Sequence, residues 1–296
     1  MSAVMKRKHF LKLMATVPLT IGMMKLTELD SLSRNFGKTE KMPALFLGHG
    51  HPMNALYDND FTRRLEQLGK EIERPNAILM LSAHWQTRGT IVSTNPWPKT
   101  IYDFGRFDER LFDIKYEPQG YPELAKKVVT LVKNADVKED DTMGLDHGAW
   151  GVLKFLYPEQ DIPVFQLSID ATKGGNFQYQ LGKQIKSLRE KGVLIIGSGN
   201  IVHNLRRMDW YNIDANPFDF TVAFDTQVKK LIESRNFDKL INYQNLGTAA
   251  AISIPTEDHY VPMLFTLGLV DKSDEIEQIY EGYQYGGISM RCFKIG

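Results

Sequence analysis

Short, unbroken apolar runs recur along the chain and predict strands that are buried on both faces. The clearest runs cover residues 44–47, 77–82, 162–168 and 193–197. Runs of this kind are typical of the central strands of an α/β sheet, because helices cover both faces of such a sheet. Residues 286–295 instead alternate between apolar and polar side chains, which predicts an edge strand.

Segments with helical spacing separate these runs. Phe61, Leu65 and Leu68, for example, would lie on one face of a helix. The expected helices cover residues 59–73, 121–135, 177–191, 218–234 and 259–269. Gly192 follows the third of these in the position that a helix C-cap takes. Because strands and helices alternate, we predict an α/β fold, a single domain with a central, mostly parallel or mixed sheet flanked by helices on both faces.

The charge balance and the cysteine count limit the classes of partner and cofactor. Lysine plus arginine and aspartate plus glutamate both number 36, so no overall positive field favours nucleic acid. The single cysteine, Cys292, excludes an intrachain disulfide framework and a cysteine-ligated metal cluster. A metal would therefore be bound by nitrogen and oxygen ligands, which suits zinc, iron(II) or manganese. The sequence indicates no particular oligomeric state.

The first 41 residues differ in character from the rest. Residues 6–8 are Lys-Arg-Lys and precede a short apolar stretch, which is the layout of an export signal. Residues 7–12 resemble a twin-arginine signal with lysine in place of the second arginine, and the alternative is an amphipathic helix that stays attached. We expect a leader and linker over residues 1–41 of a cytoplasmic or periplasmic protein, and one folded domain over residues 42–296. No apolar stretch approaches the about 20 residues that span a membrane, so stable membrane insertion is not expected.

Histidines follow several of the expected strands and glycine-rich turns. Six fall within the expected domain: His49, His51, His84, His147, His203 and His259. Because the carboxyl ends of parallel strands meet at one edge of a sheet, most of these imidazoles would share one crevice. Imidazole binds divalent metals and is also an acid or base near neutral pH. The pattern therefore predicts a mononuclear metalloenzyme.

Each of these histidines, taken alone, also has a structural explanation. His49 lies between two glycines and could cap the following helix, and His84 could be a half-buried side chain bonded to backbone. Asp146 and His147 are neighbours in sequence, so their side chains point apart and are not expected to form a dyad. We place His147 in a glycine-flanked loop, from which it could reach a cleft as an acid or base.

Two further histidines are expected at the starts of helices. His203 would lie in the first turn of a helix, where the helix dipole disfavours the charged imidazolium. Thr256 would be the N-cap of the helix that carries His259, beside a solvated run of charge. The recurrence of histidine at one topological place favours the metal site over these separate explanations.

Six segments resemble the LigB-like, or class III, extradiol ring-cleavage dioxygenases. They cover residues 42–56, 75–85, 145–153, 162–170, 197–206 and 255–268, and include GHGHP, SAHW, LDHGAWGVL, GSGNIVHNLR and PTEDHYVPM. Among these enzymes, the branch most similar to this chain is that of the DOPA 4,5-dioxygenase-like proteins. The resemblance runs in matching order from Met42 to the C-terminus. It implies that residues 42–296 form an extradiol dioxygenase catalytic domain.

The resemblance also implies one divalent metal per chain, Zn²⁺ or Fe²⁺, and assigns roles to individual residues. Three histidines match the family's metal ligands: His49, His84 and His259. His203 matches a histidine that is either a further ligand or the catalytic acid and base. His147 matches a second catalytic histidine, which contacts the substrate and transfers protons. Asp258 would either bind the metal or orient His259 from behind.

Three positions depart from the family pattern and are expected to bind the substrate. His51 stands where the family usually has serine. In the segment of residues 100–107, Tyr102 replaces a usual histidine and Arg106 a usual glycine. An added arginine would favour a substrate that carries a carboxylate, because guanidinium and carboxylate form paired hydrogen bonds.

The function implied by the resemblance is the opening of a catechol, DOPA or a related aromatic diol, to a muconic semialdehyde. The partners would be that small aromatic diol and O2. Two alternatives use the same residues: a zinc-dependent hydrolase in which a metal-bound water attacks an ester or amide, and a metal- or catechol-binding protein without turnover. Consumption of O2 separates the dioxygenase from both alternatives.

Overall fold

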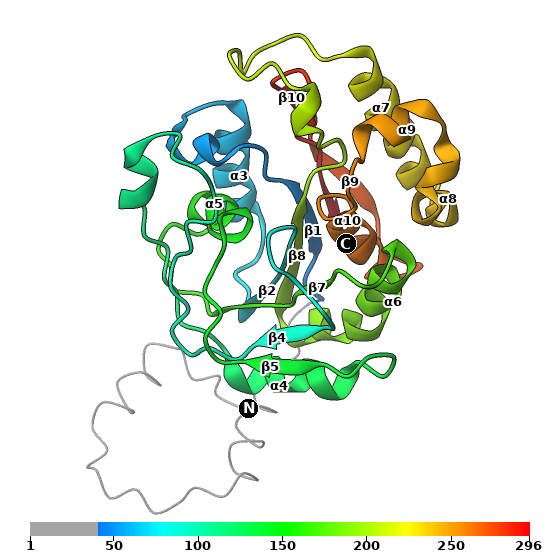
Figure 1. Ribbon diagram of the computed structural model, residues 1–296. Helices are drawn as coiled ribbons and strands as arrows, with labels where there is room; N and C mark the ends of the chain where they lie inside the picture. Colours follow the sequence, from blue (N-terminus) through cyan, green and yellow to red (C-terminus); the bar gives the residue numbers. More distant parts are fainter. Residues whose placement is uncertain (1–40) are drawn as a thin grey trace, which may run out of the picture. The chain divides into compact units, whose positions relative to one another are not determined.

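The computed structural model describes residues 41–296, and the expected leader and linker lies outside these residues except for Lys41. A six-stranded sheet runs through the described part in the order β6, β2, β8, β1, β12, β9 (Figure 1). The first four strands are parallel, and β12 is antiparallel to both of its neighbours. Their bounds are β1 (Ala44–Gly48), β2 (Ala77–Ser82), β6 (Val164–Gln166), β8 (Val193–Gly199), β9 (Ile276–Tyr280) and β12 (Cys292–Ile295).

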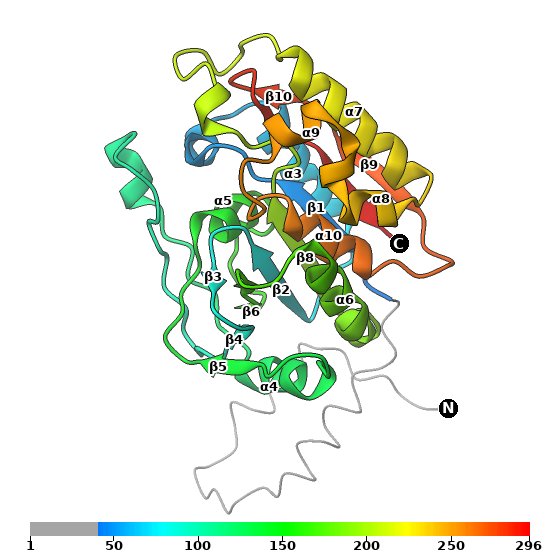
Figure 2. The ribbon, with the colours of Figure 1, turned by 45° about the vertical axis from the view of Figure 1, so that its right-hand side comes forward.

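Helices cover both faces of this sheet, which confirms the predicted α/β fold. On one face lie α3 (Asp60–Glu71) and α5 (His147–Leu156), and on the other lie α6 (Gly175–Ile185) and α10 (Val261–Gly268) (Figures 1 and 2). The remaining helices are α4 (Pro122–Leu131), α7 (Asp219–Glu233), α8 (Phe237–Ile241) and α9 (Thr248–Ser253). Helices α7, α8 and α9 lie beyond α10, in yellow and orange in Figure 2.

Shorter elements connect these layers. Three two-stranded pairs are β3 (Gln86–Thr87) with β7 (Ile169–Asp170), β4 (Ile91–Ser93) with β5 (Lys138–Asp140), and β10 (Tyr283–Gln284) with β11 (Ile288–Ser289). The 3-10 helices are η1 (Pro52–Leu56), η2 (Glu109–Asp113), η3 (Lys186–Lys191), η4 (Leu205–Arg207) and η5 (Tyr243–Leu246). The segments that carry the site lie mainly among these short elements.

The alternation along β1 explains why its apolar run is unbroken. Leu45 and Leu47 belong to the core beneath α3 and α5, and Phe46 belongs to the core beneath α6 and α10. All three side chains are fully buried. A strand with helices on both faces has no solvent side, so every position must be apolar or small.

Two expectations from the sequence are wrong at the end of the chain and at one helix start. Residues 286–295 do not form an edge strand, because β12 lies between β1 and β9 and β9 takes the edge. Thr256 does not cap a helix, because α10 begins only at Val261, and residues 256–260 form bends and turns. By contrast, Gly192 is the expected C-cap, with a φ of 75° in the left-handed region.

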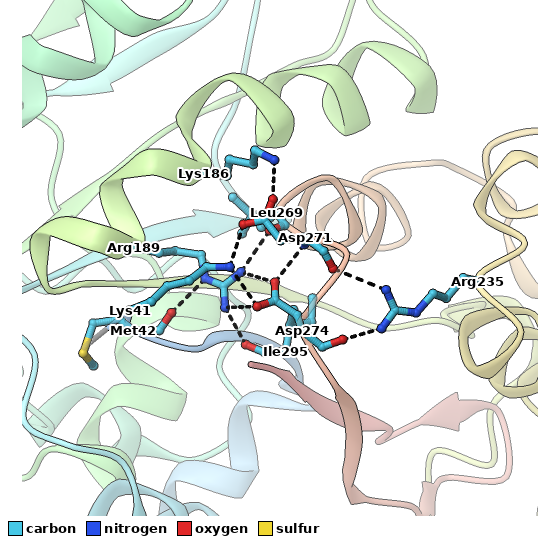
Figure 3. A network of polar contacts seen from close by, with 9 residues as sticks. All are labelled: Lys41, Met42, Lys186, Arg189, Arg235, Leu269, Asp271, Asp274 and Ile295. Carbon is cyan, nitrogen blue, oxygen red and sulfur yellow. Dashed lines mark hydrogen bonds and ion pairs between the residues drawn. The ribbon is translucent and has the colours of Figure 1, made fainter. Parts of the chain in front are cut away.

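A buried arginine ties together the chain segments at the amino end of β1 (Figure 3). The Arg189 side chain is fully buried, donates hydrogen bonds to the carbonyls of Met42, Leu269 and Ile295, and forms an ion pair of 2.6 Å with Asp274. Lys41 pairs with Asp274 as well, at 2.8 Å. These contacts satisfy the charges on a guanidinium that has no access to water, as a buried ion must be satisfied.

The carboxyl ends of β1, β2 and β8 lie side by side at the end of these strands that is opposite to the Arg189 contacts. Gly48 at the end of β1 pairs with Gly199, and Ser82 at the end of β2 pairs with Ser198. The segments that follow β1 and β2 carry His49 and His84. Within residues 41–296, no helix is long and apolar enough to cross a membrane.

Candidate active site

A cavity of about 480 Å³ opens at the carboxyl edge of the parallel strands. Its wall includes all six histidines of the described chain: His49, His51, His84, His147, His203 and His259. They come from segments that lie up to about two hundred residues apart in sequence, so the fold has gathered them as the strand-end pattern predicted. The geometry of each ring decides what it can bind.

The Nε2 atom of His49 is unprotonated and faces His84. Its Nδ1 lies 2.9 Å from Ser198 Oγ, and that hydroxyl donates its own proton to the carbonyl of Gly148 at 2.5 Å. Since Ser198 has no second proton, it accepts from His49, so the proton of His49 must be on Nδ1. Nε2 is then unprotonated, which is the form that binds a metal.

His84 is oriented in the same way by a carboxylate. Its Nδ1 lies 3.3 Å from Asp103 Oδ2, a contact that favours the proton on that nitrogen, and its Nε2 lies 3.1 Å from His49 Nε2. With both Nε2 atoms unprotonated, no hydrogen bond can join them. Two nitrogens bound to one tetrahedral Zn²⁺ at about 2.0–2.1 Å lie roughly 3.3 Å apart, so the observed separation suits two ligands of one metal.

His259 completes the set. Its Nδ1 is hydrogen-bonded to Asp258 Oδ2, and its Nε2 is buried without a hydrogen-bond partner in the described chain. A buried polar atom without a partner is costly unless something else satisfies it. One ligand atom from each of His49, His84 and His259 lies within 4.8 Å of the other two. The three residues therefore fit a divalent metal.

Burial keeps these three imidazoles neutral. Desolvation is the main cause that lowers the pKa of His49 and of His259 well below the ordinary value, and the neighbouring histidines add to it. Burial likewise lowers the pKa of His84 to about 3, against the attraction of Asp103. Neutral imidazole is the ligand form, so no proton has to leave before a metal binds at neutral pH.

Asp103 lies between His84 and His147, and the sequence pattern did not predict its role. Asp103 Oδ1 accepts a hydrogen bond of 2.9 Å from the His147 backbone N–H, and Oδ2 lies 3.0 Å from His147 Nδ1. His147 is the first residue of α5 rather than part of a loop, and Asp146 caps that helix. The only sequence signal for Asp103 was its place between Tyr102 and Phe104 in the segment that resembles the family.

His203 stacks on the ring of His259, with centroids 3.5 Å apart and an angle of 8° between the planes. It is not in the first turn of a helix, as predicted, but in a bridge to Ile288 between β8 and η4. Burial lowers the pKa of His203 to about 4, although Asp258 opposes the shift. Its ring nitrogens make no hydrogen bond within the described residues, so the ring is available to a ligand in the cavity.

The three expected substrate-binding residues are placed differently from one another. His51 lines the cavity, and burial lowers its pKa to about 4. Tyr102 lies outside the cavity wall, because its hydroxyl donates 2.8 Å to the carbonyl of Ile114 and its ring packs on Trp150. Arg106 is also outside the wall, with a side chain that is 83% exposed and paired with Glu109 at 3.6 Å.

Comparison with known proteins identifies the family. The model for the catalytic LigB subunit of aromatic ring-opening dioxygenase matches residues 42–292. The chain belongs to this family. A protein of Escherichia coli (strain K12) named 4,5-DOPA dioxygenase extradiol is 42% identical over 260 residues, which cover 86% of this chain and 95% of that relative. A Beta vulgaris protein of the same name is 33% identical over 255 residues, which cover 84% of this chain and 94% of that relative.

A solved structure shows the same fold. The crystal structure of an uncharacterized protein from Escherichia coli K12 has a TM-score of 0.75 and 39% sequence identity, and the match covers 86% of this chain and 100% of that one. The LigB family member described here is therefore a metal-dependent extradiol ring-cleavage dioxygenase that acts on an aromatic substrate with O2. The resemblance stated from the sequence motifs is confirmed, and membership favours oxygenation over the hydrolase alternative.

Proposed function

We propose that this enzyme opens a catechol with a DOPA-like side chain, and that His49, His84 and His259 hold one divalent metal for the reaction. The observation that supports the site most strongly is the convergence of ligand nitrogens from three histidines within 4.8 Å, together with a buried His259 Nε2 that has no partner in the described chain. The substrate class follows from the names of relatives that match most of the chain. Ring-opening gives a muconic semialdehyde and incorporates both atoms of O2.

We propose Fe²⁺ as the metal of the active enzyme. Zn²⁺ also binds neutral imidazoles but has no accessible redox change, and the incorporation of O2 needs an exchange of electrons. A redox-active divalent metal held by these three histidines would lower the pKa of the catechol hydroxyls and supply the electron exchange that O2 requires. Zn²⁺ in the same three-histidine site would give an inactive protein that still binds catechol.

Two histidines are proposed to handle protons. His203 is neutral at pH 7 and its ring makes no hydrogen bond to the described residues, so it accepts the proton of a catechol hydroxyl and later returns it. His147 is held by Asp103 at its Nδ1, which leaves Nε2 to contact the substrate or shuttle the second proton. Asp258 is proposed to orient His259 rather than to bind the metal, because its carboxylate is engaged with His259 Nδ1.

The assignment of His203 has its own test. H203A and H203Q should retain one metal per chain, because the three proposed ligands are intact, while kcat falls by about 10²–10⁴-fold. Metal content and steady-state O2 uptake measure the two effects separately. Loss of the metal from H203A would instead make His203 a ligand, and full activity would remove it from the mechanism.

We also propose that residues 42–296 form the complete catalytic domain. Every residue assigned above lies in this range, and Lys41 just before it forms ion pairs with Asp271 and Asp274. A chain that starts at Lys41 should therefore bind metal and consume O2 as the full chain does. A truncated protein that folds but has lost activity would show that residues 1–40 contribute to the site.

The function is tested by O2 uptake after anaerobic loading with Fe²⁺. The panel contains DOPA, caffeate and protocatechuate, with Zn²⁺-loaded protein as the control. We expect one O2 consumed per catechol cleaved and a yellow product, with DOPA or caffeate preferred over protocatechuate. No uptake with any catechol, in protein that contains one Fe²⁺ per chain, would contradict the proposal.

A further inference from the structure

Aromatic side chains frame the exposed side of the cavity. Phe107 and Trp210 are 47% and 44% exposed, and both line the cavity wall. Both rings lie near the ring of His51. The centroid distance to His51 is 4.4 Å for Phe107 and 6.1 Å for Trp210. Exposed aromatic rings at a cavity entrance favour the binding of a flat, partly apolar ligand. This frame is separate from the metal-binding histidines at the buried side.

Arg206 lines the same cavity, and backbone contacts fix the turn that carries it. It is in η4, three residues after His203, and its N–H donates a hydrogen bond of 3.1 Å to Asn204 Oδ1. Asn204 is buried, and its Nδ2 donates 2.6 Å to the carbonyl of Ile252 in α9. The turn that carries Arg206 is therefore fixed to the body of the domain.

The charge of Arg206 is not matched by a carboxylate in the described chain. Among the described residues that line the cavity, Arg206 is the one arginine and no lysine accompanies it. None of the ion pairs within residues 41–296 includes its guanidinium, whereas Arg106 pairs with Glu109 outside the cavity. Asp258, the carboxylate of the cavity wall, is engaged with His259. A bound anion could supply the missing partner.

We propose that Arg206 is a specificity-determining residue that selects catechols whose ring substituent carries a carboxylate. The inference rests on the proposed function, because the diol must be held at His49, His84 and His259 for the substituent to extend toward the entrance. Phe107 and Trp210 contact the ring and its substituent, and the Arg206 guanidinium binds the carboxylate through paired hydrogen bonds. The sequence pattern predicted this role for Arg106, but that side chain lies outside the cavity.

A matched pair of substrates tests the proposal. The pair is 3-(3,4-dihydroxyphenyl)propionate and its methyl ester, which differ only in the charge of the substituent. R206Q should raise KM for the acid about tenfold and leave kcat and the KM for the ester within about twofold. R206K should recover part of the preference, because lysine keeps the charge but not the paired geometry.

Two arginine variants serve as controls. Arg207 is the next residue of the same turn and is exposed, as Arg206 is, but it does not line the cavity, so R207Q should leave both KM values unchanged. R106Q should likewise change neither. An equal effect of R206Q on acid and ester would overturn the proposal, and so would loss of the preference in R106Q with R206Q unaffected.

Binding to the Zn²⁺-loaded full chain provides a readout that does not depend on turnover. Quenching of tryptophan fluorescence, to which Trp210 at the entrance contributes, gives Kd for the acid and the ester. We expect the wild type to bind the acid more tightly and R206Q to bind the two alike. If the wild type consumed no O2 but kept this Arg206-dependent preference, the proposed function would fail while the carboxylate site would stand. Equal Kd values for acid and ester in the wild type would overturn the site.

Discussion

At the scale of single residues, the site depends on which ring nitrogen of each histidine carries the proton. Ser198, Asp103 and Asp258 each contact the Nδ1 of one of the three proposed metal ligands, His49, His84 and His259. Partners of this kind fix the tautomer and the ring orientation before a metal arrives. Because tautomer and rotamer are already fixed, metal binding loses less conformational entropy.

Asp103 gives the sharpest test of this orientation, because one carboxylate serves both His84 and His147. D103N should weaken metal affinity by about 10–100-fold and lower kcat as well, because an amide has one acceptor oxygen and must turn its NH₂ toward either the His147 N–H or the two Nδ1 atoms. Metal affinity is measured by competition with a chelator, and kcat by O2 uptake at saturating metal. D103E should recover part of both.

The control for this prediction is Asp108, a carboxylate of the same segment that pairs with Arg110 and does not touch the histidines. D108N should bind metal and turn over as the wild type does. If D103N kept the wild-type metal affinity and kcat, the carboxylate would have no part in orienting the histidines.

At the scale of elements, the sequence predicted the strands that deliver the ligands better than the loops that complete the site. The runs before His49 and His84 are apolar at every position because both sheet faces are covered, and this signal is local. Asp103 meets His147 across 44 residues of chain, and neither spacing nor periodicity encodes that contact. The same reason explains why the sequence pointed to Arg106, whereas Arg206 is the arginine that lines the cavity. Which side chain of an irregular loop faces a cavity leaves no periodic pattern in the sequence.

The position of His203 was predicted incorrectly for a related reason. Small residues after β8 suggested a helix start, but the segment instead pairs with β11, whose Ile288 lies 85 residues away in sequence. The order of strands in the sheet was also beyond local pattern, which is why β12 was expected at an edge. Tertiary pairing, and not propensity, decided both outcomes.

The close approach of β8 to the segment before α10 yields a prediction at this scale. A Cβ added at Gly199 would lie 2.2 Å from the carbonyl oxygen of His259, which also accepts a hydrogen bond from the Asn200 N–H. G199A should therefore displace His259, lower the free energy of unfolding by about 1–3 kcal/mol and weaken metal binding. Urea unfolding of the metal-free protein and chelator competition measure the two effects.

Gly151 in α5 is the matched control. A Cβ there would have no neighbour within 4 Å, so G151A should keep metal affinity and gain up to about 1 kcal/mol of stability from the better helix former. A G199A protein with unchanged metal affinity would show that the β8 contact does not position His259.

At the scale of the whole molecule, the two ends of the parallel strands carry different kinds of residue. The carboxyl edge carries the histidines, and the amino edge carries the ion-pair network around Arg189 in Figure 3. That network joins the beginning of β1, the end of α10 and the end of β12. Stability and chemistry can therefore be changed separately, by substitutions at opposite edges.

The network predicts how stability depends on pH. Hydrogen bonds from Lys186, and then from Lys41, lower the pKa of Asp271 to about 2, below the about 3.9 of an unfolded aspartate. Because the folded-state pKa is the lower one, Asp271 stabilises the fold above about pH 4, and this contribution is lost as the pH falls toward about 2. D271N should therefore show a weaker dependence of unfolding free energy on pH in this range.

Urea unfolding between pH 2 and pH 6 measures this dependence. D141N, which changes an exposed aspartate with no ion pair in the described chain, should keep the wild-type slope. A D271N protein with the wild-type slope would show that the contacts to Lys186 and Lys41 do not affect the pH dependence of folding.

The central claim is that one metal is held by the Nε2 atoms of three particular histidines. Anomalous scattering from crystals of the Zn²⁺-loaded protein tests it most directly, because the method locates the metal without assuming its ligands. The account predicts one peak per chain, about 2.0–2.1 Å from Nε2 of His49, His84 and His259. A peak bound through Nδ1, or one centred on His203 and Asp258 without His49 and His84, would contradict it.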